Sequence, residues 1–123
     1  MSAVATLVGT FRLGRDAEVR TAPDHEPACS LLLAYNWGRR DPVTDKRLTQ
    51  WVDAHMWGRR VTQLSPGLVR GALVWALIED IHVERYAPNT DPDHLRNKLT
   101  GRIGRIEILS PRADAHDCTL PKA

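Results

Sequence analysis

Hydrophobic and polar residues alternate most clearly from Leu48 to Trp57. In an extended strand successive side chains point to opposite sides, so this stretch divides into two sets. One set is small or flexible and apolar, and the other has two indoles spaced by polar groups: Val52, Ala54 and Met56 against Trp51, Asp53, His55 and Trp57. A period of two over this length predicts a half-buried strand. The indoles are either a surface for stacking unpaired bases or, alternatively, the core side of an ordinary sandwich strand.

Four further strands and one helix are predicted in the same way. The strands are expected at 3–11, 29–37, 72–86 and 99–109, a short extended segment at 17–20, and loops at 23–27, 38–47 and 87–98. Apolar residues recur at helical spacing in 58–70, but Ser65-Pro66-Gly67 interrupts that helix. Five strands with one helix between the third and fourth are the order of an oligonucleotide/oligosaccharide-binding (OB) barrel. We expect an all-β domain over residues 1–109 with one short helix, a five-stranded OB-fold barrel, followed by a short disordered C-terminal segment at 110–123.

Two positions within these strands carry expectations of their own. Gly9 lies inside the first strand, where a glycine predicts a kink or bulge. Trp75 has the same parity as Leu73 and Leu77 in the fourth strand, so we expect it in the core or at a subunit interface.

Composition narrows the class of protein. The chain has 123 residues, of which 42% are hydrophobic and 26% charged, as in an ordinary single globular domain. Its net charge of +2 disfavours non-specific duplex binding. Most of the 17 basic residues are nevertheless arginine, whose side chain suits contacts with phosphates. No signal peptide and no membrane-spanning apolar segment are expected. Cys29 and Cys118 lie far apart in the sequence, and Cys29 is expected as a small core residue without a disulfide in a reducing cytoplasm.

No pattern in the sequence indicates catalysis. Asp53 and His55 would point the same way on a strand, with no nucleophile in view, and no serine has a nucleophile-elbow context. The triplet His116-Asp117-Cys118 offers too few ligands for a metal. We therefore expect no enzyme, no metal site and no cofactor.

Six short motifs resemble, in their order and near their spacing, those of bacterial single-stranded DNA-binding proteins. They are Leu7-Val8-Gly9, Leu13-Gly14-Arg15-Asp16 with Glu18-Val19-Arg20, Leu33-Ala34, Thr49-Gln50-Trp51, Trp57-Gly58-Arg59 and Arg70-Gly71. The resemblance covers residues 3–109, and no single motif is specific by itself. It implies an OB barrel that assembles as a homotetramer more readily than as a dimer and wraps single-stranded DNA by stacking and backbone contacts.

Carried over by position, the resemblance implies a set of nucleic-acid-binding residues. Trp51 matches a family tryptophan, Trp57 its usual phenylalanine, Tyr86 a tryptophan in the fourth-strand hairpin, and Trp37 a stacking aromatic at the end of the second strand. With the basic loop beside them, the expected binding residues are Trp37, Trp51, Trp57, Tyr86, Arg39, Arg40, Lys46, Arg47, His55 and Arg85. Further basic candidates are Arg15, Arg20, Arg96 and Lys98.

The chain departs from the family pattern at three places. One extra residue is expected as a bulge near Glu79-Asp80, and Val52-Asp53 stands where the family has His-Arg, which puts an acid on the expected binding face. The family's acidic, phenylalanine-terminated tail has no counterpart before Ala123, so no tail-mediated recruitment of repair enzymes is expected.

The sequence thus predicts sequence-tolerant single-stranded DNA binding in replication, recombination or repair, with a mobile element as one setting. We expect the protein in the bacterial cytoplasm, associated with the nucleoid. The alternative is an adaptor of the replication-restart primosome type, whose main role is protein–protein interaction. Asp53 and the missing tail favour that alternative, whereas tryptophans at stacking positions disfavour it.

Overall fold

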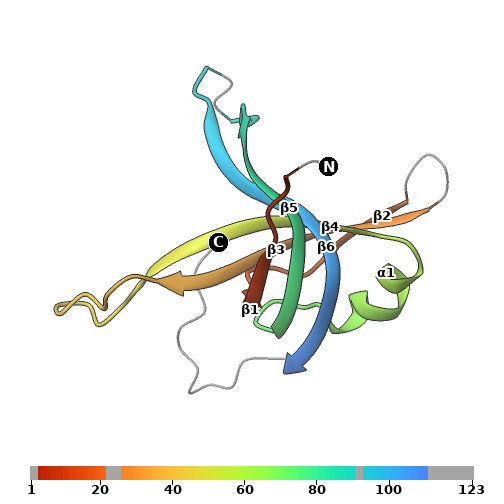
Figure 1. Ribbon diagram of the computed structural model, residues 1–123, viewed down its shortest axis with the longest axis horizontal. Coiled ribbons are helices and arrows are strands. Elements are labelled where there is room, and N and C mark those ends of the chain that lie inside the picture. Colours follow the sequence, from red (N-terminus) through yellow and green to blue (C-terminus); the bar gives the residue numbers. More distant parts are fainter. Residues whose placement is uncertain (1–2, 22–25, 91–92, 111–123) are drawn as a thin grey trace.

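Six strands make up most of the structure (Figure 1), a computed structural model that describes residues 3–21, 26–90 and 93–110. The strands are β1 (Leu7–Leu13), β2 (Glu18–Thr21), β3 (Pro27–Trp37), β4 (Leu48–Trp57), β5 (Leu73–Tyr86) and β6 (Arg96–Ser110). One short helix, α1 (Arg59–Leu64), follows β4 and passes into a 3-10 turn, η1 (Ser65–Gly67). The α-helix ends there because Pro66 lacks the amide hydrogen that would continue it, as the sequence predicted.

Five strands close into a barrel in the order β1, β5, β6, β4, β3 and back to β1. The ring is completed where Arg12 and Leu13 of β1 pair with Ala34 and Leu33 of β3. β4 and β6 run parallel from Val52 to His55 of β4, and the other pairings are antiparallel. The predicted five-stranded OB barrel with one short helix is confirmed. β2 is a sixth, short strand that pairs with β3 outside the ring.

The core lies inside the barrel, and it contains the β4 residues that the sequence predicted to face inward. Val52, Ala54 and Met56 are fully buried, and α1 and the turn after it add Val61 and Leu68. Burying a side chain of valine or leucine size contributes about 1.5–3 kcal/mol. The remaining fully buried large side chains come from the other strands of the ring: Leu13, Leu31, Leu33, Val74, Ile78 and Ile103.

Two strand irregularities were expected, one in β1 and one in β5, and the structure has only the second. Gly9 pairs with Ala76 in unbroken register, so the predicted kink or bulge at Gly9 is wrong. On β5 the register with β6 shifts between Glu79 and His82, and Asp80 has a φ of 54°. The bulge predicted near Glu79-Asp80 is therefore confirmed.

Trp75 lies on the outside of the barrel. Its neighbours Val74 and Ala76 are fully buried, whereas Trp75 is half-buried and faces outward with Leu73 and Leu77. The expectation of a core position is wrong, because both parities of β5 are apolar and the pattern does not tell inside from outside. A subunit interface stays a prediction for this residue.

Two hairpins project from the barrel, one from β3 and β4 and one from β5 and β6 (Figure 1). β6 begins at Arg96, in the expected loop, and includes Ser110, which the sequence assigned to the C-terminal segment. The expectations for Cys118 and the rest of 111–123 lie outside the described residues. No helix among the described residues is long and apolar enough to cross a membrane.

Candidate nucleic-acid interface

The outer side of β4 carries the residues that the sequence singled out. Trp51, Asp53 and His55 are half-buried, and Trp57 is 47% exposed. The alternative in which Trp51 and Trp57 form the core is wrong, because the residues between them fill the barrel. Trp51 and Trp57 lie six residues apart, which in a strand is a distance of about 20 Å.

Trp51 rests on the turn after β1. A Cβ atom built on Gly14 would lie 2.4 Å from Cζ3 of Trp51, so the indole occupies the space that any other side chain would need. The Gly14 amide donates to the Leu32 carbonyl oxygen at 2.9 Å, which fixes the turn beneath the ring. Glycine at this position therefore leaves room for the indole of Trp51, which packs against the turn on one side.

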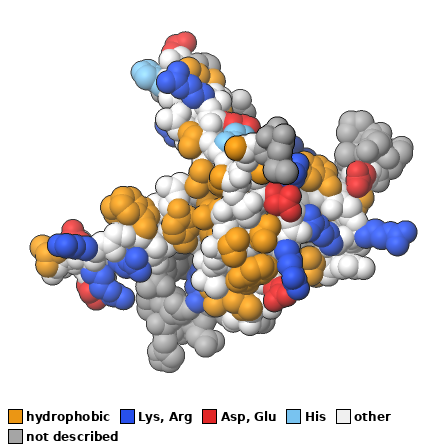
Figure 2. Space-filling model, in the orientation of Figure 1, with side chains coloured by type: hydrophobic (Ala, Val, Ile, Leu, Met, Phe, Trp, Pro, Cys, Tyr) orange, Lys and Arg blue, Asp and Glu red, His pale blue; other side chains and the backbone are white. Residues whose placement is uncertain are grey.

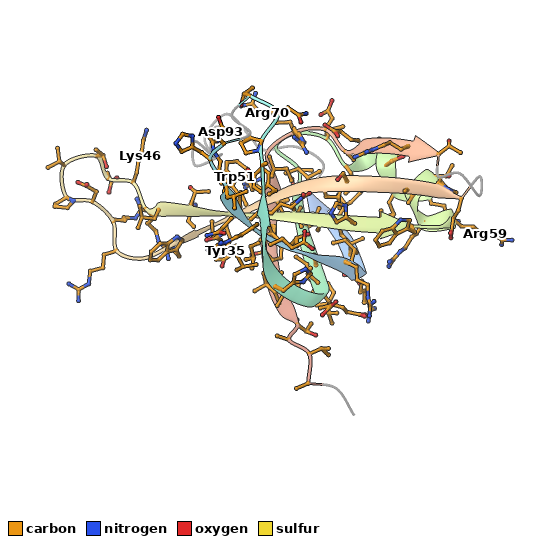
Figure 3. The ribbon with its side chains drawn as sticks, turned by 90° about the horizontal axis from the view of Figure 1, so that it is seen from above. Tyr35, Lys46, Trp51, Arg59, Arg70 and Asp93 are labelled. Atoms are coloured by element: carbon orange, nitrogen blue, oxygen red, sulfur yellow. The ribbon has the colours of Figure 1, made fainter. Side chains whose placement is uncertain are left out.

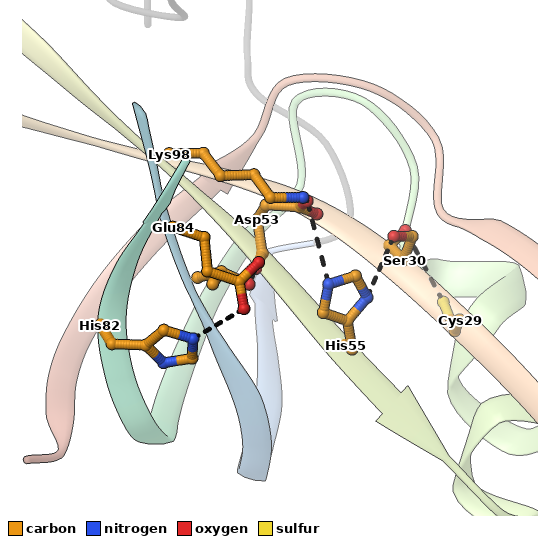
Figure 4. A network of polar contacts seen from close by, with 8 residues as sticks. Cys29, Ser30, Asp53, His55, His82, Glu84 and Lys98 are labelled. Atoms are coloured by element: carbon orange, nitrogen blue, oxygen red, sulfur yellow. Dashed lines mark hydrogen bonds and ion pairs between the residues drawn. The ribbon is translucent and has the colours of Figure 1, made fainter. Parts of the chain in front are cut away.

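His55 lies between Asp53 and Ser30 (Figure 4). Its ring lies 6.1 Å from that of Trp57 between centroids, tilted by 34°. Its Nδ1 atom is 3.3 Å from the Ser30 hydroxyl, and its Nε2 atom is 3.8 Å from Oδ2 of Asp53. The imidazole is thus held between β3 and β4 beside the exposed indole.

Lys98 links Asp53 to the β5–β6 hairpin. Its ammonium group donates to Oδ2 of Asp53 at 3.1 Å and lies 5.4 Å from the ring centroid of Tyr86, a cation–π contact. The other oxygen of Asp53 is buried and has no hydrogen-bond partner among the described residues. The sequence placed Asp53 on the binding side as an unpaired acid. In the structure Lys98 balances its charge, and Asp53 orients the ammonium group of Lys98 toward Tyr86.

We call this surface the aromatic face and define it by Trp51, Asp53, His55, Trp57, Tyr86 and Lys98. Four of the ten predicted binding residues lie on it: Trp51, His55, Trp57 and Tyr86. Lys98 was only a further basic candidate in the sequence, because its pairing with Asp53 joins positions 45 residues apart. The signal in the sequence was Asp53 itself, because an acid among the outward aromatic residues of β4 indicates a cation on a neighbouring strand.

Two predicted residues lie away from the aromatic face. Trp37 is 48% exposed but pairs with Leu48, one position out of phase with the outward residues of β3 and β4. Arg85 pairs with Asn97 and so lies on the opposite side of the hairpin from Tyr86.

The four basic residues of the 38–47 loop differ in how they are held. Arg40 contacts Asp45 at 3.4 Å, and Nε of Arg47 donates to the Gly38 carbonyl oxygen at 2.9 Å. The side chains of Arg39 and Lys46 have no hydrogen-bond or ion-pair partner among the described residues, and Figure 3 shows Lys46 projecting from the loop. These last two are the loop cations available to an external anion.

Ser30, His55 and Asp53 lie in the order of a hydrolytic triad, so the expectation that no nucleophile is near His55 is wrong. Ser30, however, is only 7% exposed and sits in β3 where that strand pairs with both β2 and β4. The backbone of Ser30 is therefore engaged in the sheet on both sides, unlike that of a nucleophile on an exposed turn. Burial raises the pKa of the free Cys29 thiol, which disfavours a thiolate nucleophile. No three His, Cys, Asp or Glu residues in the described ranges could hold a metal ion.

A second polar pair lies on the β5–β6 hairpin (Figure 4). The ring nitrogens of His82 are 2.6 Å from the Asp80 carbonyl oxygen and 2.8 Å from Oε1 of Glu84. Only a protonated imidazole donates from both nitrogens, so the Asp80 carbonyl, and then Glu84, raise the pKa of His82. The same hydrogen bond lowers the pKa of Glu84.

These shifts define a pH window for the hairpin. The His82 contribution to stability is complete below its ordinary pKa of 6.5 and is lost as pH rises through the raised folded-state pKa. The Glu84 contribution is present above 4.5 and is lost as pH falls through the lowered folded-state pKa. The pair stabilises the hairpin most between these two limits.

No protein-family model matches the chain, and no curated protein matches it significantly. Its function is therefore inferred from the barrel and from the geometry of the aromatic face.

Proposed function

We propose that this protein binds single-stranded DNA by stacking bases on the aromatic face, with little dependence on sequence along most of the strand. The observation that carries the proposal is the outward placement of Trp51 and Trp57 on one barrel strand. Every base has a π-surface, so such platforms accept any sequence, and each stacked base contributes about 1–3 kcal/mol. A protein with this activity would act in DNA replication, recombination or repair.

The charge distribution supports the same proposal. Phosphate contacts would come from Arg39 and Lys46, whose side chains have no hydrogen-bond or ion-pair partner among the described residues. Because Lys98 balances Asp53, the acid adds little repulsion toward a phosphate backbone. This pairing also removes the reason for which Asp53 favoured the adaptor alternative.

Intrinsic tryptophan fluorescence titrated with oligo-dT at two salt concentrations tests the proposal. Single-stranded DNA should quench the emission strongly, whereas a duplex of equal length should quench it little, because paired bases are not free to stack. Equal quenching by both, or none by either, would overturn the proposal. Absence of binding together with capture of a purified replication-restart protein would favour the adaptor function instead.

A homo-oligomer, a tetramer before a dimer, is part of the proposal. Figure 2 shows hydrophobic side chains gathered over β1 and β5, where Val8 pairs with Leu77 beside Trp75, and Val8 is half exposed. An exposed apolar patch of this kind is typical of a surface that another subunit covers. Light scattering should give a multiple of the 13.8 kDa chain mass, and Trp75→Glu should lower it. A monomer at micromolar concentration would contradict this.

A further inference from the structure

A hollow of about 400 Å³ opens beside Trp57, at the edge of the aromatic face. The sheet register puts Arg20 of β2, Ala28 of β3 and Trp57 of β4 in one row across the three strands. Since Ala28 ends at its methyl group, a gap remains between the guanidinium and the indole. The volume is at the lower end of the range for small-molecule pockets, about 300–1,000 Å³.

The groups around this hollow are arranged to hold a flat, polar ring. The indole of Trp57 offers a stacking surface, and Ser30 and His55 line the next row of the sheet. The side chain of Arg20 is exposed and has no hydrogen-bond or ion-pair partner among the described residues. No carboxylate of the described residues lines the hollow, so its one formal charge is a donor-only guanidinium.

We propose that this hollow binds one guanine base of the single strand, stacked on Trp57 with O6 and N7 accepting hydrogen bonds from Arg20. Guanine presents two adjacent acceptors on that edge and matches the fork of an arginine. On that same edge adenine and cytosine present an amino group, which cannot accept from the guanidinium, and thymine offers one acceptor beside a methyl group. The inference rests on the proposed function and adds one base-selective position to otherwise tolerant binding.

The proposal distinguishes Arg20 from the cations of the 38–47 loop. A base contact is lost for one base only, whereas a phosphate contact is lost for every sequence. Arg20→Lys keeps the charge and removes the bidentate fork, and the site is exposed, so the variant should fold normally. Arg39→Ala is the matched control for a residue that contacts phosphate.

The experiment measures the affinity of four strands of about 15 nucleotides, all thymine except for one central guanine, adenine, cytosine or thymine. The parent protein should bind the guanine strand about 5- to 150-fold more tightly than the others. Arg20→Lys should abolish that preference and keep the affinity for the all-thymine strand. Arg39→Ala should weaken all four strands by the same factor and keep the preference.

Three results would overturn the inference. Equal affinity of the parent for all four strands would overturn it while leaving single-stranded DNA binding intact. Uniform weakening of all four strands by Arg20→Lys would show that Arg20 contacts the backbone. Failure of the parent to bind any strand would overturn both this inference and the proposed function.

Discussion

Replacing Gly14 with alanine tests how Trp51 is positioned without removing the indole itself. The new Cβ would lie 2.4 Å from Cζ3 and 2.9 Å from Cη2 of Trp51. To restore an ordinary contact, the ring has to move by about 1 Å or more. The backbone of Gly14 does not have a positive φ, so the effect of the substitution is the clash alone.

The magnitude follows from the cost of overpacking. Forcing an extra methyl group against a packed ring costs about 1–3 kcal/mol, which for a domain of this size lowers Tm by about 4–12 °C. The displaced ring should also lose up to the 1–3 kcal/mol of a stacked base in the affinity for oligo-dT. Thermal melts and fluorescence titrations measure the two effects separately.

The decisive comparison is a double-mutant cycle with Trp51→Ala. In that background the clash is absent, and Gly14→Ala should stabilise the protein by about 0.4–1 kcal/mol by restricting the unfolded chain. The sign of the effect on Tm should therefore reverse. If Gly14→Ala is equally destabilising in both backgrounds, the packing of Trp51 against this position does not explain why glycine is needed there.

Three further predictions concern other parts of the surface. Trp57→Ala should weaken oligo-dT binding by about 1–3 kcal/mol and change stability by no more than about 0.5 kcal/mol, because its ring is exposed; a large fall in Tm would contradict this. Changing Arg39 and Lys46 together to alanine should flatten the dependence of log K on log salt by about 1.4, and an unchanged slope would exclude loop contacts with phosphate. Glu84→Gln should lower the pKa of His82 toward 6.5 in an NMR titration and reduce the loss of hairpin stability as pH rises; an unaltered titration would rule out the contact.

The parts of the fold that the sequence predicted are those in which one strand face is polar and the other apolar. In β4 the contrast between Ala54 and its neighbours Asp53 and His55 favoured the orientation that the structure has, although the two indoles left the opposite orientation open. β5 gave no such contrast, since Val74 and Trp75 are both apolar, and the strand orientation was set by packing against partners distant in the sequence.

The candidate site was predictable residue by residue but not as an arrangement. Alternation identified Trp51 and Trp57, yet the position of Lys98 over Asp53 depends on the parallel pairing of β4 with β6. The arginine of the hollow, Arg20, was only one of several basic candidates, because the row that it shares with Trp57 follows from strand register. Period-two patterns contain no information on which strands become neighbours.

The parallel pairing of β4 with β6 also has a consequence for the order of folding. The two strands are separated in the chain by α1 and all of β5, so their contact closes a long loop and should form after the β3–β4 and β5–β6 hairpins. The ion pair between Asp53 and Lys98 lies across this late-forming seam. A bound DNA strand that contacts both β4 and β6 would stabilise their pairing. We therefore expect oligo-dT to slow unfolding as well as to raise Tm.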